Sequence, residues 1–182
     1  MGVFNLADQF LNYYEYHTNP VNQIIHFVFV PVLTFSFTML LTSMGIKWPI
    51  LSSIFSPENP YVMNIGFLFI TLLIIYYLLL DRFTGSILAV ELISFLILSV
   101  HLYGTLNRTT YFFVIALTQL VGWGTQFAGH GIWEGRRPAL VDNGLQVFIA
   151  PLFVMVEAMF FLGLKQDLKK EVEQKLKARR SK

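Results

Sequence analysis

Long runs of apolar residues, separated by short polar stretches, dominate the pattern of this chain. Four such runs cover about residues 20–45, 61–80, 86–103 and 109–127, and the helical pattern of the last can extend as far as Glu134. A helix needs about 20 mainly apolar residues to cross the hydrocarbon core of a bilayer, and each run is long enough. The pattern therefore predicts four membrane-spanning helices in an all-α integral membrane protein.

Shorter segments surround these runs. Residues 4–17 are mixed in character, and Phe4, Leu11 and Tyr14 share one helical face, which predicts a short amphipathic helix at the membrane interface. Pro20 is tolerated at the first position of a helix, so a break is expected there. Residues 47–60 contain three prolines and are predicted to form a loop, whereas Gly85 marks a tight link between the second and third helices.

The C-terminal part adds a fifth apolar segment, Gln146 to Leu164, and a tail of alternating charges. This fifth segment either crosses the bilayer fully or is re-entrant or in-plane. Pro151 and Glu157 lie within it and allow the second arrangement. We expect residues 1–164 to form a single membrane catalytic domain. Residues 165–182 are expected to form a basic, solvent-exposed helix.

Composition narrows the function classes. Hydrophobic residues make up 55% of the 182 positions and charged residues 13%, against about 25% charged in soluble domains. Eight of the thirteen Lys and Arg residues lie at or beyond Lys165, so no basic face for nucleic acid is expected. The absence of cysteine excludes disulfides and thiolate metal sites. The first twenty residues contain no Lys or Arg, so we expect no cleavable signal peptide.

Polar residues gather in two stretches that are far apart in sequence, 16–26 and 126–143, and these hold three of the four histidines. Polar side chains inside membrane helices are costly, so they need a functional or structural reason. Four crossings return the chain to its starting side, which places both stretches at the same membrane face. We therefore expect His17, His26 and His130 to meet.

Spacing supports this meeting. His17 and His26 would point in opposite directions on one continuous helix, and a break at Pro20 removes that conflict. Asn22 and His26 are four residues apart and share a helical face. Gln126, His130 and Glu134 follow at the same interval and form a polar stripe, which Gly129 and Gly131 leave open to a neighbouring helix or a substrate.

Imidazoles with carboxylate or amide neighbours suit Fe(II), Zn(II) or Mn(II), and donor type alone does not distinguish these ions. Arg136 and Arg137 are candidates for a topology signal, an anchor for lipid headgroups or a clamp on a substrate carboxylate. The clamp is considered because arginine binds carboxylates through two hydrogen bonds. His101 lacks comparable neighbours and is a weaker ligand candidate. Glu91 and Glu157 lie within apolar runs, as paired structural groups or as part of a cavity wall.

Two sets of motifs resemble the 2-hydroxy fatty acid dioxygenases, over nearly the whole chain. The resemblance rests on Tyr13-x-x-Tyr16-His17-x-Asn19-Pro20-x-Asn22-x-x-x-His26 with Val30-Pro31, on Trp123-x-x-Gln126-Phe127-x-Gly129-His130-x-x-x-Glu134-x-Arg136-Arg137-Pro138-Ala139-Leu140-x-Asp142-Asn143, and on Gln146 and Pro151-x-Phe153.

The resemblance implies an Fe(II)-dependent α-oxidation, in which a long-chain 2-hydroxy fatty acid such as 2-hydroxypalmitate reacts with O₂ and emerges one carbon shorter. It implies iron ligation by His17, His26 and His130, with Glu134 as a further ligand or a supporting group. His101 lies outside the motifs. We expect a substrate site formed by Asn22, Gln126, Asn143, Arg136 and Arg137, with the acyl chain among the apolar helices.

The family acts in fungal phytosphingosine breakdown, which implies a multi-pass protein of the endoplasmic reticulum membrane. The basic tail indicates a cytosolic C-terminus. If the fifth segment is re-entrant or in-plane, the histidines face the cytosol as well, and this is the arrangement that we expect. Membrane lipids are expected neighbours, and neither a nucleic acid nor a protein partner is predicted. The alternatives are a haem or quinone protein and a non-enzymatic lipid-binding or scaffold protein with structural histidines. A di-iron desaturase is disfavoured, because such enzymes carry many more histidines in clustered boxes.

Overall fold

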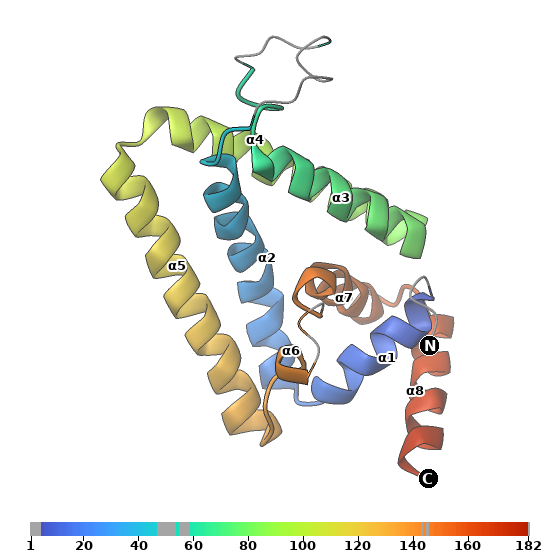
Figure 1. The fold of residues 1–182 in the computed structure, drawn as a ribbon. Helices are drawn as coiled ribbons and strands as arrows, with labels where there is room; N and C mark the ends of the chain where they lie inside the picture. The colour runs from blue at the N-terminus through green and yellow to red at the C-terminus, as the bar shows by residue number, and fades with distance from the viewer. Residues whose placement is uncertain (1–4, 47–53, 55–58, 143, 145, 182) are drawn as a thin grey trace.

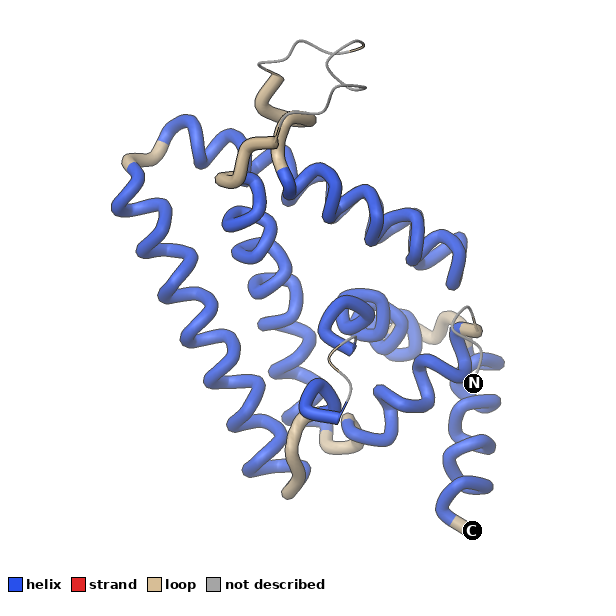
Figure 2. Tube along the Cα trace, in the orientation of Figure 1, coloured by secondary structure: helices blue, strands red, loops and turns tan. Residues whose placement is uncertain are grey.

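The computed structural model of the chain describes residues 5–46, 54, 59–142, 144 and 146–181. Over these residues it is helical, without a β-strand, apart from an isolated bridge between Gly45 and Asn64. Figure 2 shows the helices and the loops between them. In chain order the elements are α1 Leu6–Tyr16, α2 Pro20–Thr42, α3 Ile65–Leu80, α4 Arg82–Thr105, α5 Arg108–Ala128, the π-helix η2 Gly129–Glu134, α6 Ala139–Asp142, α7 Gln146–Phe161 and α8 Gln166–Arg180.

The predicted break at Pro20 is confirmed. The Asn19 side chain accepts a hydrogen bond from the backbone N–H of Val21 and caps α2, whose first residue is Pro20. Proline suits this position because its fixed φ angle is helical and the missing N–H would have had no intrahelical partner. The cap therefore separates α1 from α2 and sets the corner that carries His17.

The second apolar segment is shorter than predicted. Asn64 caps α3 through a 2.8 Å hydrogen bond from the N–H of Phe67, so the helix begins at Ile65 rather than Tyr61. Its 16 residues span about 24 Å at 1.5 Å per residue, less than the hydrocarbon core of about 30 Å. The prediction that this segment is long enough to cross a bilayer is therefore wrong. The predicted loop 47–60 lies almost entirely outside the described residues.

The tight link between the second and third apolar segments is confirmed, although α4 already starts at Arg82. Asp81 ends α3 and caps α4, with its carboxylate accepting the N–H of Thr84 at 2.9 Å. A Cβ at Gly85 would lie 2.8 Å from the backbone of Tyr77, so only glycine fits this approach. The two helices consequently form a hairpin with almost no loop.

The fourth apolar run continues to Glu134, as the sequence allowed, but its last turn is a π-helix. Gly135, with φ of 63°, ends it in the left-handed conformation that glycine adopts readily. Single π-turns within helices are rare and are often found at functional sites. This one contains His130.

Figure 1 shows the arrangement of these elements. The helices α2 and α5 run antiparallel, the α3–α4 hairpin closes one end, and α1 and η2 lie at the other end. Among the residues that the structure describes, three helical stretches are long and apolar enough to span a membrane: 20–42, 82–105 and 108–134. Large apolar side chains on these stretches, including Ile24, Val90 and Leu120, are exposed as lipid-facing residues would be. The chain is therefore an all-α integral membrane protein.

The fifth apolar segment does not run alongside the spanning helices. Figure 1 shows α7 nearly end-on, whereas α2 and α5 lie in the plane of the view. The chain then bends by 111° into α8. This placement is typical of an in-plane or re-entrant segment, the arrangement that Pro151 and Glu157 allowed.

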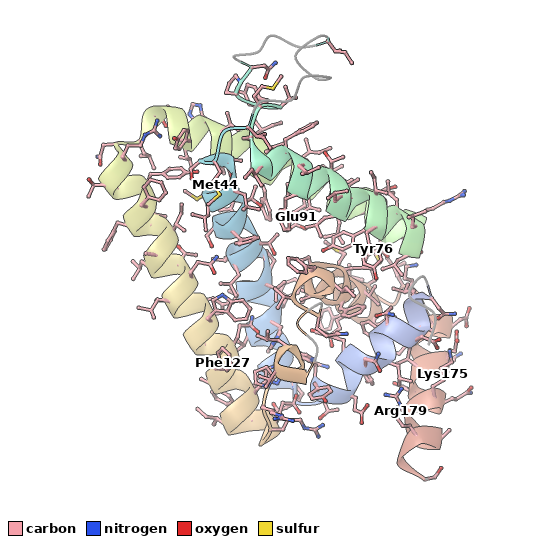
Figure 3. The ribbon with its side chains drawn as sticks, viewed as in Figure 1. Met44, Tyr76, Glu91, Phe127, Lys175 and Arg179 are labelled. Carbon is pink, nitrogen blue, oxygen red and sulfur yellow. The ribbon has the colours of Figure 1, made fainter. Side chains whose placement is uncertain are left out.

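The tail is helical, but the expectation of full solvent exposure is wrong for one of its faces. Val172 and Leu176 are buried against α1 and α7 in one core cluster. Lys175 and Arg179 extend from α8 to the α1 carboxylates Asp8 and Glu15, at 3.0 and 2.8 Å (Figure 3). The helix is therefore docked, because its i, i+4 apolar positions give it a stripe that the charge pattern concealed.

Candidate metal centre

Three histidines from three separate elements converge in the interior, as predicted. His17 ends α1, His26 lies in the first turns of α2, and His130 lies in η2. They are 3, 6 and 2% exposed, respectively. One ring nitrogen from each lies within 4.8 Å of the others, and the Nε2 atoms of His17 and His26 are 3.0 Å apart. The group has the composition and spacing of a metal site.

The hydrogen bonds of His17 and His26 determine which nitrogen carries the proton. Their Nδ1 atoms lie 2.7 and 2.9 Å from the carbonyl oxygens of Tyr13 and Asn22, which can only accept. Each Nδ1 is therefore the donor, and each Nε2 of a neutral ring presents a lone pair. Two lone pairs 3.0 Å apart repel unless a cation lies beside both. A metal ion, about 2.1 Å from each nitrogen ligand, satisfies that condition.

Protonation of His17 does not relieve the repulsion between the two Nε2 lone pairs, because this imidazole is neutral near pH 7. Burial, followed by the adjacent His26, lowers the pKa of the His17 imidazole well below its ordinary value. His17 is therefore neutral near pH 7, with its Nε2 lone pair available. The Nδ1 of His130 is also buried and has no hydrogen-bond partner within the described part of the chain. All three rings fit a bound cation.

A buried polar network holds His17 in place. The ring of Tyr13 stacks on that of His17 with centroids 3.8 Å apart, and its hydroxyl donates to Glu157 at 3.1 Å. The Gln23 amide donates both to the His17 carbonyl and to Glu157, at 2.9 and 3.2 Å. Glu157 is thus a paired structural group, one of the two roles considered from the sequence, and it ties α7 to the metal centre.

Glu134 does not join the histidine group and serves as a supporting residue. Its carboxylate accepts the N–H groups of Thr18 and Asn19 at 2.8 Å, the Thr18 hydroxyl at 3.0 Å and the Asn22 amide at 3.3 Å. These four bonds engage both oxygens and fit the supporting role, one of the two roles considered from the sequence; the ligand role stays a prediction. The carboxylate fixes the corner between α1 and α2, because it binds the N–H groups that the helix start leaves unpaired.

The two arginines do not line the cavity beside the histidines. The guanidinium of Arg136 donates to the carbonyl of Glu15 at 3.0 Å and lies 5.8 Å from the centre of the Tyr16 ring. Arg137 is exposed. The predicted carboxylate clamp is therefore not assembled, since Arg136 instead caps the C-terminal end of α1, where a cation is favoured.

The other candidates are also placed by the structure, except Asn143, which lies outside the described residues. His101 is exposed near the end of α4, just before α5 begins, whereas His130 follows the end of α5; His101 is not part of the histidine group. Glu91 on α4, labelled in Figure 3, lines a separate cavity of about 190 Å³. Neither residue contributes to the metal centre.

The helices α2 and η2, which carry His26 and His130, pack closely against each other at Gly129. A Cβ at Gly129 would lie 2.4 Å from Oδ1 of Asn22, whereas one at Gly131 would meet nothing within 4 Å. Gly129 therefore allows the close approach expected from the sequence, and Gly131 does not take part in it. Asn22 is fully buried at this contact and also supplies the carbonyl that orients His26.

A cavity of about 250 Å³ adjoins the three histidines. Its walls come from α1, α2, α3, α5, η2, α6 and α7, and most of the lining residues are apolar. Besides the histidines, they include Val30, Leu33, Phe37, Phe69, Leu73, Trp123, Phe127, Leu140, Val147 and Phe148, together with the glutamines Gln119, Gln126 and Gln146. Such a site fits a ligand with a long apolar body and a small polar end.

Sequence reasoning left several of these residues without a role. Tyr13 and Gln146 belong to the family motifs, yet nothing in their spacing places them beside the histidines. Gln23 lies three residues before His26, an interval that does put both on one side of α2. That interval was the one local signal available, because the partner, Glu157, is 134 residues away.

Comparison with known proteins adds independent information. The sequence profile of the family described as "2-hydroxy-palmitic acid dioxygenase Mpo1-like" matches residues 3–162. The chain is 36% identical over 177 residues to the 2-hydroxy-palmitic acid dioxygenase MPO1 of Saccharomyces cerevisiae, a match that covers 96% of this chain and 91% of the yeast protein. No solved structure matches the chain. The profile match includes all three histidines and the whole cavity wall.

Proposed function

The chain belongs to the Mpo1-like family of 2-hydroxy-palmitic acid dioxygenases, and on that basis we propose that it oxidises long-chain 2-hydroxy fatty acids to acids one carbon shorter. The observation that carries this proposal is the position of the buried histidines. His17, His26 and His130 stand at one side of a mostly apolar cavity, where a polar head can lie beside them.

We propose Fe(II) as the metal held by these three histidines. Three neutral nitrogen donors leave coordination positions open, as non-haem iron oxygenases require. Bound iron would supply the one-electron chemistry that lets O₂ react with an organic substrate. The protein's own contribution is to hold the three imidazoles in one tautomer and orientation, through the carbonyls of Tyr13 and Asn22.

The cavity wall supports a long-chain substrate. Its aromatic and aliphatic side chains exclude water and favour an acyl chain, whose burial contributes about 0.8 kcal/mol for each CH₂ group. The overall reaction balances with one O₂ consumed and with one CO₂ and one water released, while the remaining chain becomes a carboxylic acid. The carboxyl carbon of the substrate is the atom that leaves.

The direct test is to incubate detergent-purified protein with ferrous iron, oxygen and 2-hydroxypalmitate labelled with ¹³C at the carboxyl carbon. We expect unlabelled pentadecanoic acid and labelled CO₂ in equal amounts, and no product from palmitate. Formation of a product that retains the label would contradict this reaction, and absence of any turnover would favour the non-enzymatic lipid-binding alternative.

We also propose that the protein resides in the endoplasmic reticulum membrane, acts in sphingolipid breakdown and presents its metal centre at the cytosolic face. The docked basic helix α8 supports this orientation, because cytosolic segments of membrane proteins carry an excess of Lys and Arg. In Figure 1 its C-terminal end lies towards the same end of the bundle as η2. Accessibility of tags at both termini to a cytosolic protease tests the assignment.

A further inference from the structure

Two glutamines in the cavity wall carry polar atoms without partners. Nε2 of Gln126 and Oε1 of Gln146 are buried, and neither has a hydrogen-bond partner among the residues that the structure describes. The two residues are 5 and 7% exposed and line the same cavity as the histidines. One comes from the end of α5, four residues before His130, and the other begins α7.

Such atoms are unusual, because a buried polar group without a partner costs about 1–3 kcal/mol. Native proteins hold few of them, and each calls for an explanation. Here the donor and the acceptor belong to two residues that line one cavity next to a metal-binding group. A ligand that offers a matching acceptor and donor would satisfy both.

A third glutamine in the same wall shows the contrast. The Gln119 amide donates to the Leu33 carbonyl and the Ser36 hydroxyl, at 3.2 and 2.7 Å. Its carbonyl oxygen accepts the indole N–H of Trp123 at 2.9 Å. Gln119 is therefore a structural residue of the α2–α5 contact, and unpaired amides are not a general property of this cavity.

We propose that Gln126 and Gln146 bind the polar head of the substrate, with Gln126 donating to the carboxylate and Gln146 accepting from the 2-hydroxyl. This rests on the proposed function. A carboxylate can only accept hydrogen bonds, so it needs the N–H of Gln126, whereas a hydroxyl can supply the proton that Oε1 of Gln146 lacks. The two arginines, which lie outside the cavity, are not needed for this recognition.

Gln146 is then the residue that selects 2-hydroxy acids over ordinary fatty acids. An acid without the hydroxyl leaves Oε1 of Gln146 buried and unpaired. Sites built to bind a substrate hydroxyl reject analogues that lack it for this reason. Gln126, in contrast, contacts the carboxylate that both classes of acid share, so it contributes to affinity without discriminating between them.

The test replaces each glutamine with methionine, which keeps the length of the side chain and removes its hydrogen bonds. Binding of 2-hydroxypalmitate and of palmitate is measured by calorimetry on the full-length protein in detergent. The protein is freed of metal by chelation, so that metal contacts to the hydroxyl do not contribute. The matched control is Gln119→Met, in the same wall.

For Gln146→Met we expect affinity for 2-hydroxypalmitate to fall about tenfold, the loss of roughly one hydrogen bond, while affinity for palmitate changes little. Gln126→Met should weaken binding of both acids by similar factors. Gln119→Met should keep the ratio of the two affinities, even if it lowers stability. An unchanged ratio in Gln146→Met overturns the assignment.

If a variant does not fold, the role of Gln146 can be tested on the wild-type protein by comparing the binding of related acids. Fluorine is close to a hydroxyl in size but has no proton to donate, so 2-fluoropalmitate should bind no more tightly than palmitate. Binding as tight as that of 2-hydroxypalmitate would overturn the role of Gln146. Turnover by the wild-type protein is measured in parallel, so failure of this inference and failure of the proposed reaction are told apart.

Discussion

Gly129 allows the end of α5 to approach α2 closely beside the histidines. A Cβ at this position would lie 2.4 Å from Oδ1 of Asn22 and 3.3 Å from Cδ1 of Ile25. Asn22 cannot easily move away, because it is fully buried and its carbonyl accepts the Nδ1 proton of His26. A methyl group at residue 129 therefore bears directly on the metal centre.

We expect Gly129→Ala to lower stability by about 1–3 kcal/mol, as overpacking typically does. Metal affinity should fall about 10–100-fold, because a residue that orients a ligand is displaced. Thermal unfolding and metal titration of the purified variant measure both effects. Gly131→Ala, where a Cβ meets nothing within 4 Å, is the matched control and should bind metal like wild type. Equal losses in both variants would show that contact with Asn22 is not the cause.

The convergence of the histidines could be predicted from the sequence, but the hydrogen-bond partners of two nearby charged residues could not. The meeting of the three histidines was predicted from the break at Pro20 and from four expected crossings, and in the structure the antiparallel course of α2 and α5 brings the segments together. The partners of Glu134 and Arg136 were not found, since these two side chains bind Thr18, Asn19 and the Glu15 carbonyl more than 110 residues away. A carboxylate near a histidine looks the same in sequence whether it binds a metal or a helix start.

Among the helices, the corner at Asp81 joins three elements. Its carboxylate caps α4 at Thr84 and forms an ion pair with Lys165, at 2.8 Å, immediately before α8. Burial alone would raise the pKa of Asp81, but the hydrogen bonds from Lys165 and Thr84 outweigh it and hold the pKa below 3.8. The ionised form is therefore the one that stabilises the fold.

Asp81→Ala should lower stability by about 1–2 kcal/mol near pH 7, because it removes both the helix cap and the ion pair. Asp81→Asn keeps a capping oxygen and should lose less. Because folding lowers the pKa, the advantage of wild type over Asp81→Asn should be full above pH 3.8 and vanish as the pH falls through the folded-state pKa. Denaturant unfolding at several pH values tests this. A difference that persisted or grew at low pH would contradict the ion pair.

The elements follow the hydrophobic pattern except where side chains set the boundaries. The runs correctly placed α2, α4, α5 and α7, because helices that face lipid or lie in the core are apolar all round and can be recognised without a partner. The start of α3 was predicted four residues too early, because the helix begins after the Asn64 cap, inside the apolar stretch. The π-turn was also missed, because Gln126, His130 and Glu134 at four-residue steps read as an ordinary helix.

In the molecule as a whole, the metal centre connects the two halves of the chain. His17 and His26 come from the first 26 residues, and His130 comes from the last of the long helices. A bound ion therefore links α1, α2 and η2, and its binding free energy adds to the stability of the fold.

Removal of the metal by chelation should lower the thermal unfolding midpoint by about 5–10 °C, if the ion contributes about 2.7 kcal/mol at a hundredfold excess over Kd. Adding ferrous iron back should restore the midpoint. Differential scanning fluorimetry in detergent measures the shift. An unchanged midpoint in protein from which the metal has been removed would mean that the ion does not join these elements.

The position of the active end was predictable from topology, whereas the shape of the cavity was not. Four crossings were expected to return the chain to its starting end. In the structure the antiparallel helices α2 and α5 do this, and the α3–α4 hairpin closes the opposite end. The course of α7 across the bundle and the docking of α8 on α1 depend on contacts between the two ends of the chain. Composition and periodicity carry no information about such contacts.

The most direct measurement is the metal content of the purified protein and of four alanine variants, by elemental analysis after loading with ferrous iron. We expect one ion per wild-type chain, loss of the ion in His17→Ala, His26→Ala and His130→Ala, and full retention in His101→Ala. Full retention of metal in any of the first three variants would show that the three imidazoles do not share a single ion.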